Sequence, residues 1–466
     1  MTSTIKVNTI QNACGADIIK ESGNTITIGA SGDTVTLGTG ASQTGFGRTG
    51  TVNWCTTAKT SPLTVESGKG YFLNTTSGGI TVTLPSSPSA GDIVAFKDYA
   101  NKWDCNAVTI CRNGSNINGG AFNTCLSTES QSVTLIYVDG TKGWQDIHDS
   151  TSNVTGQPNF VSATGGTITT CGDFKIHTFT GDGSFVVTQG AVASNNKVSY
   201  LVVAGGGGSG SNHGGGGGAG GFREGKLSTD PYTASPKAAT PCSSLPVSTQ
   251  TYPITVGGGG NGATVPSPYA GATNGSPSTF STITSAGGGR GGTRHDGSNP
   301  GYHNGSPGGS GGGTGGENGG ATAGSGNDPS ASPPQGNSGG AWTSPYFGGG
   351  GGGAGGAGSN ASGGAAGGIG AGTGINPASP VGTPGPSGSL RYFSGGGGAG
   401  NSPSTPTPNG GYGGGGAGYS SGCGPTRFQG GINTGGGGGA LYGCGLAACA
   451  TGIGGSGIVI IRYKFQ

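Results

Sequence analysis

Blocks of consecutive glycine between residues 201 and 457 constrain this chain more than any other feature. Seven blocks of four to six glycines occur, at 205–208, 214–218, 257–260, 348–353, 395–398, 413–416 and 435–439. Glycine loses more backbone entropy on ordering than other residues and has no side chain to bury, so ordinary helices and strands are not expected in these blocks. A disordered Gly/Ser linker is one interpretation of such a composition.

Three observations favour an ordered domain over a linker. The blocks recur in one context, an aromatic residue followed by glycines and then Ala-Gly, as after Phe347, Phe393 and Tyr412. Two segments rich in β-branched and aromatic residues, 198–203 and 458–463, frame the glycine region and predict strands. Long spans of the region carry no charged residue, whereas a solvated coil is usually charged.

Glycine runs can form an ordered structure, the extended left-handed helix with three residues per turn known as polyglycine II. This helix has no internal hydrogen bonds, so neighbouring segments must satisfy its backbone groups. The runs lack the strict glycine triplet of collagen, and a run without side chains allows close neighbours on every side. We therefore predict a bundle of parallel and antiparallel polyglycine-II helices, with aromatic residues at its margins and variable loops at its ends.

The composition limits the classes of function. Of 466 residues, 114 are glycine, 30% are hydrophobic and 8% are charged, against about 25% charged in an ordinary domain. This composition excludes an α/β enzyme with one large core. The net charge of +2 gives no reason to expect a nucleic-acid partner, and no apolar run approaches a signal peptide or a membrane span. We expect synthesis in a cytosol, reduced cysteines and no metal site.

The first 46 residues contain a short repeat that predicts a separate segment. GNTITIG at 23–29 is followed by GDTVTLG at 32–38, and each copy predicts a short strand closed by glycine turns. One chain of such units cannot cover its own apolar face. We expect residues 1–46 to be an intertwined β segment for attachment and oligomerisation, with a two-stranded hairpin belonging to the next domain as the alternative.

Residues 47–150 predict a β-sandwich of about six strands. The strands are expected at 71–74, 80–84, 93–97, 107–111, 133–138 and 144–147. Trp54, Trp103 and Trp144 are expected in the core of this sandwich or at its rim. Residues 151–170, rich in Thr, Ser, Gly and Asn, are expected to be a polar linker.

Residues 171–466 are expected to form the glycine domain. A hairpin with strands at 174–179 and 185–187, turned by residues 181–183, precedes the first framing strand. A further strand is expected at 252–256. The fold class that we predict is all-β, with an intertwined N-terminal segment, a middle sandwich, and a C-terminal β framework that encloses the polyglycine-II bundle.

The sequence offers little basis for catalysis or cofactor binding. Gly205, Gly207 and Gly210 follow a strand and match a dinucleotide-binding pattern, with Glu224 in place of a ribose-binding acid, but the next residues cannot start the required helix. Few acids follow residue 226, namely Asp230, Asp296, Glu317 and Asp328. We expect no enzyme activity, no catalytic residue and no cofactor; paired acids assembled between chains, as in a depolymerase, are the remaining enzymatic interpretation.

Charged and aromatic residues that interrupt the neutral glycine region are the candidate binding residues. Aromatic faces beside hydrogen-bonding groups suit sugars and other amphipathic surface ligands. The alternative is that these side chains only close the ends of the bundle. The candidates are Arg290, Arg294, His295, Tyr302, His303, Trp342, Tyr346, Arg427 and Phe428.

Two families of phage proteins resemble parts of this sequence. Fibre proteins of tailed phages from aquatic environments, including cyanophages, resemble STIKVNTIQNACGADIIKESGNTITIGASGDTVTLGTG and GYFLNTTSGGITVTLPSSPSAGDIVAFKDYA…VTLIYVDGTKGWQDI. Glycine-rich phage adhesin domains with polyglycine-II cores are similar to YLVVAGGGG…GGGGAGG…YPITVGGGG…SGIVIIRY. Inserts rich in proline and serine, near 228–250 and 372–390, depart from the adhesin pattern.

The resemblance implies a homotrimeric virion fibre, made in the host cytoplasm and acting outside the cell. Its N-terminal segment would attach to the baseplate or another virion protein. Its glycine domain would bind a host glycan or outer-membrane protein. Nucleic-acid binding and membrane insertion are not expected. The alternative is a purely structural filament, virion-borne or secreted, without receptor binding.

Overall fold

The protein, seen here in a computed structural model, divides into two compact units, Met1–Gly156 and Gln157–Gln466, which are described separately. The structure describes residues 9–11, 13, 15, 17–22, 25–28, 52–151, 158–192, 195–239, 243–265, 271–294, 302–316, 320–343, 347–361, 365–378, 380–400, 406–419, 428–443 and 449–466. Within these ranges every regular element is a β-strand, which confirms the all-β prediction.

The N-terminal part of the first unit contains a small antiparallel sheet. Its strands are β1 (Thr9–Gln11), β2 (Asp17–Ser22) and β3 (Thr25–Ile28), paired in that order. The first copy of the predicted repeat forms β3, and the second copy at 32–38 lies outside the described residues. Pairing with other copies of the chain stays a prediction.

The rest of the first unit is a β-sandwich, in agreement with the sequence. The five-stranded sheet has the order β12 (Gly143–Asp149), β11 (Ser132–Asp139), β8 (Ile93–Asp98), β6 (Lys69–Leu73), β4 (Asn53–Lys59). The four-stranded sheet has the order β10 (Thr124–Leu126), β9 (Val108–Cys111), β7 (Ile80–Thr83), β5 (Leu63–Thr64). The chain passes from sheet to sheet between β4 and β9, so neighbouring strands there run parallel.

The two sheets of this sandwich share one hydrophobic core. Trp103 and Trp144 are fully buried in it, whereas Trp54 is 39% exposed at the rim and packs against the ring of Phe72 at 5.0 Å. All six predicted strands are present. The sequence missed β4, β5 and β10, because β4 leaves most of its residues exposed and the other two are only two and three residues long.

The second unit is built on two further sheets, here called the framework. The larger sheet has the order β14 (Thr167–Cys171), β15 (Phe174–Phe179), β28 (Ile458–Lys464), β17 (Lys197–Val203), β18 (Phe222–Gly225), β19 (Ala238–Ala239), with β20 (Leu245–Pro246) also paired to β17. The smaller sheet has the order β13 (Ser162–Thr164), β16 (Gly183–Gln189), β21 (Thr251–Thr255), β23 (Ser278–Phe280), β24 (Ile283–Ser285).

The framing strands β17 and β28 pair with each other at the centre of the larger sheet. Val198, Tyr200 and Val202 face a core shared with the smaller sheet. Leu201 and Val203 face a second core on the opposite side. Burial on both faces explains why these two strands are continuous apolar runs rather than alternating ones.

Two predictions about the start of this unit are wrong. Strands β15 and β16 form no hairpin, since β15 pairs with β14 and β28 while β16 pairs with β13 and β21 in the other sheet. Phe179 and Phe185 both enter the core between the sheets, so the chain crosses from one sheet to the other. The linker expected at 151–170 is also too long. Val161 and Ala163 are buried in the same core, and the range 151–170 contains β13 and most of β14.

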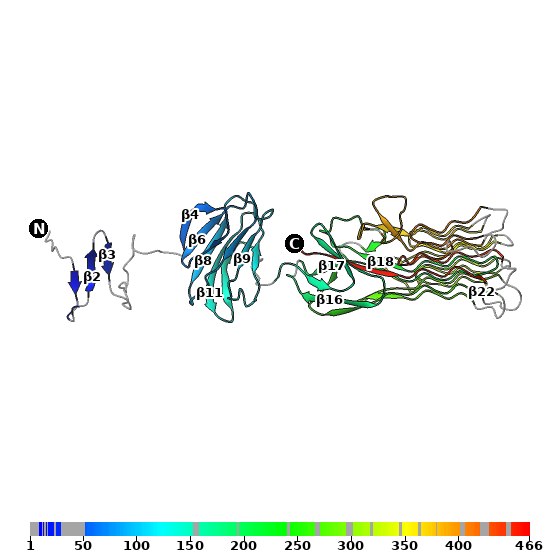
Figure 1. The fold of residues 1–466 in the computed structure, drawn as a ribbon, viewed down its shortest axis with the longest axis horizontal. Coiled ribbons are helices and arrows are strands. Elements are labelled where there is room, and N and C mark those ends of the chain that lie inside the picture. The colour runs from blue at the N-terminus through cyan, green and yellow to red at the C-terminus, as the bar shows by residue number, and fades with distance from the viewer. Residues whose placement is uncertain are drawn as a thin grey trace. The chain divides into compact units, whose positions relative to one another are not determined.

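The framework strands continue directly into the glycine segments, which lie side by side and extend to the opposite end of the unit (Figure 1). Four short strands lie along this body, paired as β25 (Ala371–Thr373) with β26 (Arg391–Phe393) and β22 (Thr264–Val265) with β27 (Cys449–Ala450). We call these side-by-side segments the glycine bundle. The end beside β22, away from the framework, is called the far end.

Backbone hydrogen bonds join each glycine segment to several neighbours in rotation. In the segment 205–210, residues three apart donate to the same neighbour, and successive residues donate to different ones. The three acceptor segments are 273–276, 452–455 and 215–218, all antiparallel to the donor segment, at N···O distances of 2.8–3.0 Å. A period of three residues is the one that the polyglycine-II prediction requires; the conformation of the individual segments stays a prediction.

The carbonyl groups of the same segment bond to three other neighbours. Gly205 and Gly208 accept from Gly288 and Gly291, which makes that pair of segments parallel. Gly206 and Ser209 accept from Gly260 and Ala263, again in parallel, and Gly207 accepts from Gly438. One segment is thus bonded to six neighbours, so the bundle extends in all directions across its axis, unlike a sheet.

The close spacing of these segments explains the glycine blocks. A Cβ atom placed on Gly217 would lie 2.1 Å from the carbonyl oxygen of Gly207, and one on Gly205 would lie 2.0 Å from that of Gly258. Real side chains never approach backbone atoms so closely. Alanine is accepted where a methyl group fits, as at Ala219 and Ala440, both fully buried.

The inserts near 228–250 and 372–390 are anchored to the framework by buried polar contacts. Glu224 on β18 accepts hydrogen bonds from the Thr373 hydroxyl (2.6 Å) and the Ser235 amide (2.8 Å), and burial raises the pKa of this carboxyl. Asp230 forms an ion pair with Arg462 of β28 at 2.9 Å. Glu224 therefore has a structural role, and the glycines of the dinucleotide-like pattern lie in the bundle.

A single methyl group inside the bundle is expected to destabilise the second unit. Gly217→Ala should reduce its free energy of unfolding by about 1–3 kcal/mol, because neighbouring backbones must move apart. Gly258→Ala is the matched control, since an added Cβ there meets nothing within 4 Å. Scanning calorimetry of both variants is the measurement, and equal unfolding temperatures would contradict the close-packed bundle.

The buried His177 on β15 is expected to make the second unit less stable in acid. Its Nδ1 donates to the Gly165 carbonyl (2.7 Å), its Nε2 lies 3.2 Å from the Tyr463 hydroxyl, and burial lowers its pKa below 6.5. The unfolded chain then binds the proton more readily, so this contribution to stability is complete above about pH 6.5 and declines as the pH falls below it. Denaturant unfolding should show a larger loss between pH 7 and 5 for the wild type than for His177→Phe; equal losses would exclude this role.

Candidate functional site

The turn at 211–213 and the segments bonded to it form the far end of the bundle. Asn212 and His213 adopt positive φ angles of 49° and 58°, which reverse the chain between two antiparallel glycine segments. The His213 amide donates to the Tyr442 carbonyl at 2.7 Å, and the Arg294 amide donates to the Ser211 carbonyl at 3.2 Å. Candidate residues from distant parts of the sequence meet around this turn.

Arg290 and Tyr302 form a contact close to the far end: the Thr293 amide donates to the Tyr302 carbonyl, and Arg290 lies three residues before Thr293 in the same segment. The guanidinium carbon lies 5.5 Å from the centre of the Tyr302 ring, and Nη1 donates to the Asn304 carbonyl at 3.5 Å. Burial lowers the pKa of Arg290, although the residue stays charged at neutral pH. Tyr302 is 37% exposed, and its ring packs against Gly271, where an added Cβ would lie 2.4 Å from the Tyr302 ring.

Arg294, His213 and Tyr442 form a second contact set. Arg294 Nη1 lies 3.4 Å from His213 Nδ1, and because arginine only donates, this ring nitrogen accepts. The rings of His213 and Tyr442 meet edge to face at a centroid distance of 4.2 Å. His213 is only 5% exposed, so it orients Arg294 and Tyr442 rather than facing solvent.

Phe428 belongs to a small apolar cluster beside this set. It is 8% exposed and packs with Leu441 and Tyr419, and the Tyr442 amide donates to the Tyr419 carbonyl at 3.0 Å. The Phe428 ring therefore packs the end of the bundle. Its backbone carbonyl accepts from Gly439 at 2.7 Å.

The remaining candidates are placed as follows. Trp342 is half-buried and follows Ala341, whose amide donates to the Asn360 side chain at 2.9 Å. His303 is half-buried, and its carbonyl accepts from Gly315 at 2.9 Å. His295, Tyr346 and Arg427 lie outside the described residues.

The sequence missed His213, Tyr419 and Tyr442 as parts of this end. The available signal was local: Ser-Asn-His interrupts two glycine blocks, and a chain reversal with positive φ favours asparagine. The contact of His213 with Tyr442 had no such signal, because the two residues are far apart in the sequence.

Chemically, the far end offers guanidinium groups, ring faces and backbone carbonyls. Such groups bind hydroxyl-rich and anionic ligands by stacking and charge-assisted hydrogen bonds. Over the ranges that the structure describes, no cluster of His, Cys, Asp and Glu could hold a metal ion. Cys55, Cys105, Cys111, Cys125 and Cys171 are free thiols.

Comparison with protein families agrees with this architecture. A family model described as a glycine-rich domain matches residues 178–464, more than half of the chain, so the chain belongs to this family. The match begins within β15 and ends within β28, and it therefore includes the bundle together with most of its framework. No curated protein matches the chain. None of the described residues forms a helix long and apolar enough to cross a membrane.

Proposed function

We propose that this chain is a fibre-like adhesin of a tailed-phage virion and contacts a host surface glycan or outer-membrane protein through the far end. The observation that carries the proposal is the concentration of guanidinium, imidazole and aromatic groups at one end of a body with few interior side chains. Such a body would hold these groups away from its framework. The resemblance of residues 1–150 to phage fibre proteins supports the place on a virion, with attachment through the N-terminal segment.

The chemistry of the far end favours a glycan as ligand. Arg290 is already stacked on Tyr302 and partly desolvated, so less hydration is lost when it donates to a sugar hydroxyl or carboxylate. The exposed part of the Tyr302 ring offers a face on which a sugar ring can stack. Trp342 and Tyr442, both half-buried, would add further ring surface.

A structural fibre without receptor binding is the second candidate. The burial of His213 and Phe428 favours it, because these side chains close the end of the bundle. The two functions differ in one respect that can be measured: an adhesin keeps the half-buried rings accessible in the assembled fibre, whereas a filament covers them.

We also propose that the chain is not an enzyme. Asp230 is held by Arg462 inside the framework, and Asp328 is exposed in a segment between glycine runs. Asp296 and Glu317 lie outside the described residues. Two carboxylates held together by a rigid scaffold, as hydrolysis of glycosidic bonds requires, are thus not found among the described members of this set.

The N-terminal sheet supports a homotrimer. Ile10 on β1 and Ile28 on β3 are 46% and 37% exposed, and both lie on one face of the sheet because each is paired with Ile19 of β2. Copies of this sheet lying side by side would cover these side chains. Nucleic acid and membrane insertion have no part in this proposal.

Host binding tests the adhesin proposal directly. Labelled protein is expected to adsorb to at least one strain in a panel of aquatic bacteria that includes cyanobacteria, and Arg290→Ala combined with Tyr302→Ala should reduce adsorption about tenfold. Ile432→Ala is the matched control, since Ile432 is 78% exposed and its neighbours bond near the framework, to Gly414 and Ser456. Adsorption that is unaffected by the double variant would assign binding to another surface, whereas a wild-type protein that adsorbs to no strain would favour the filament.

Sedimentation equilibrium tests the trimer. The full chain is expected at three times its mass of 44.3 kDa. Ile10→Asp combined with Ile28→Asp should shift it towards the monomer, because charges would then lie in the covered interface. A monomeric wild-type chain, or a trimer that the double variant leaves intact, would contradict the role of this sheet.

A further inference from the structure

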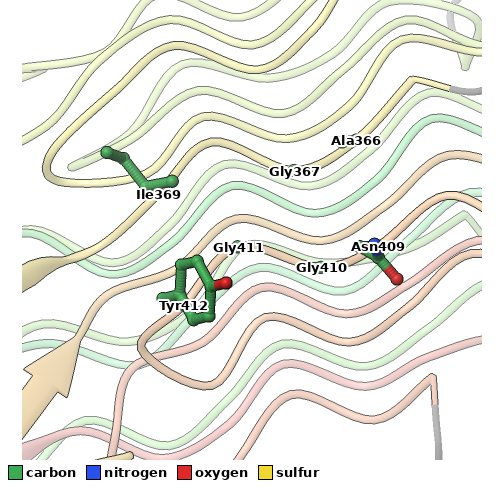
Figure 2. A pocket seen from close by; sticks show the side chains of 7 residues that line it. All are labelled: Ala366, Gly367, Ile369, Asn409, Gly410, Gly411 and Tyr412. Atoms are coloured by element: carbon green, nitrogen blue, oxygen red, sulfur yellow. The ribbon is translucent and has the colours of Figure 1, made fainter. Parts of the chain in front are cut away.

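A groove lies on the flank of the glycine bundle, between two of its outer segments. Its volume is about 410 Å³, and it is lined by Ala366, Gly367, Ile369, Asn409, Gly410, Gly411 and Tyr412. Figure 2 shows Ile369 and Tyr412 near each other and Asn409 further along the second segment. The groove lies near the framework, because the Tyr412 ring is 6.4 Å from that of Tyr392 on β26, and the next residue of β26, Phe393, packs in one core with Leu201 and Val203 of β17. The groove is therefore a different surface from the far end, and a ligand there would not depend on receptor binding.

The two segments beside the groove run parallel. The Gly367 amide donates to the Asn409 carbonyl at 2.9 Å, and the Gly370 amide donates to the Tyr412 carbonyl at 2.8 Å. These bonds repeat after three residues on both segments, as they do inside the bundle. The groove is thus a place on the outside of the bundle where one more segment of the same kind could lie.

The lining of the groove has unused hydrogen-bond donors with the same period. The amides of Ala366 and Ile369, and those of Asn409 and Tyr412, have no hydrogen-bond partner within the described part of the chain. Each pair is three residues apart. In the interior of the bundle, amides with this spacing donate to one neighbouring segment, as in 205–210.

A ligand that matches this lining needs carbonyl acceptors at intervals of three residues. A polyproline-II segment has three residues per turn and a rise of about 3.1 Å per residue, so its carbonyl groups recur at that interval. Proline has no amide hydrogen, so such a segment brings acceptors and no donor that would need a partner in the groove. None of the described residues that line the groove is charged, in keeping with an uncharged ligand.

The exposed side chains at one end of the groove match the rings of proline. Ile369 is 52% exposed and Tyr412 is 53% exposed, and both lie beside backbone that carries unused donors. Aromatic side chains next to hydrogen-bond donors are the usual way in which proteins bind proline-rich segments. We propose that this groove binds a proline-rich segment of a partner protein in the polyproline-II conformation.

Binding of fluorescein-labelled decaproline to the full chain, followed by fluorescence anisotropy, tests the proposal. A labelled Gly-Ser peptide of the same length is the control ligand. Ile369→Pro removes one donor and breaks no hydrogen bond within the described residues. It should raise the Kd for decaproline at least tenfold, whereas Ile369→Val, which keeps the donor, should leave the Kd within about twofold.

Tyr412→Ala tests the ring surface and should also raise the Kd at least tenfold. Tyr99→Ala is its matched control, because Tyr99 is 57% exposed in the first unit. Equal calorimetric unfolding temperatures would establish that the variants are folded. The proposal is overturned if decaproline binds no better than the Gly-Ser peptide, if Ile369→Pro and Ile369→Val bind it equally, or if Tyr412→Ala dissociates an oligomer, which would assign the groove to a second copy of the chain.

Discussion

Hydrogen bonding between the backbones of side-chain-free segments is the interaction on which the rest of the second unit depends. Each such bond stabilises a fold by only about 0.5–1.5 kcal/mol, while ordering one residue costs about 1–2 kcal/mol. Glycine is at the costly end of that range. The bundle is therefore stable only because many bonds form together around segments such as 205–210, which is bonded to six neighbours. Added side chains would remove this close spacing, and with it the bonds.

The framework supplies the hydrophobic side-chain cores that the glycine segments cannot form. Strands β17 and β28 are buried between two hydrophobic cores, so burial of apolar side chains stabilises the starting positions of the glycine segments that continue from them. Extended strands in a sheet already lie about 4.8 Å apart, which brings the following segments within hydrogen-bonding distance. Changes in the loops at the far end leave these contacts intact, and this is a physical reason why a surface for variable recognition suits this fold.

Groups that could bind a ligand lie at the boundaries of the bundle, namely at its far end and on its flank. At the far end, segments stop and side chains such as Arg294 and Tyr302 follow, and Arg290 lies in the last turns of a segment that still bonds to its neighbours. On the flank, outer segments lack a neighbour, so amides such as that of Ile369 have no acceptor among the described residues. The sequence singled out Arg290 and Tyr302 because charged and aromatic residues are rare in the glycine region, and their part in binding stays a prediction. It gave no indication of the flank groove, because unused backbone donors have no sequence pattern.

The kind of structure follows from the amino-acid sequence alone: glycine blocks exclude a side-chain core within the segments that contain them, and the β-branched runs at 198–203 and 458–463 predict the strands that frame these segments. The alternating pattern of the longer sandwich strands is local, so six of them could be predicted, whereas the exposed β4 and the short β5 and β10 could not. Which segments pair with each other is visible only in the folded chain, as in the separation of β15 from β16 and the bond between Gly206 and Gly455. One glycine run is chemically identical to another, so pairing depends on where the framework strands place each run.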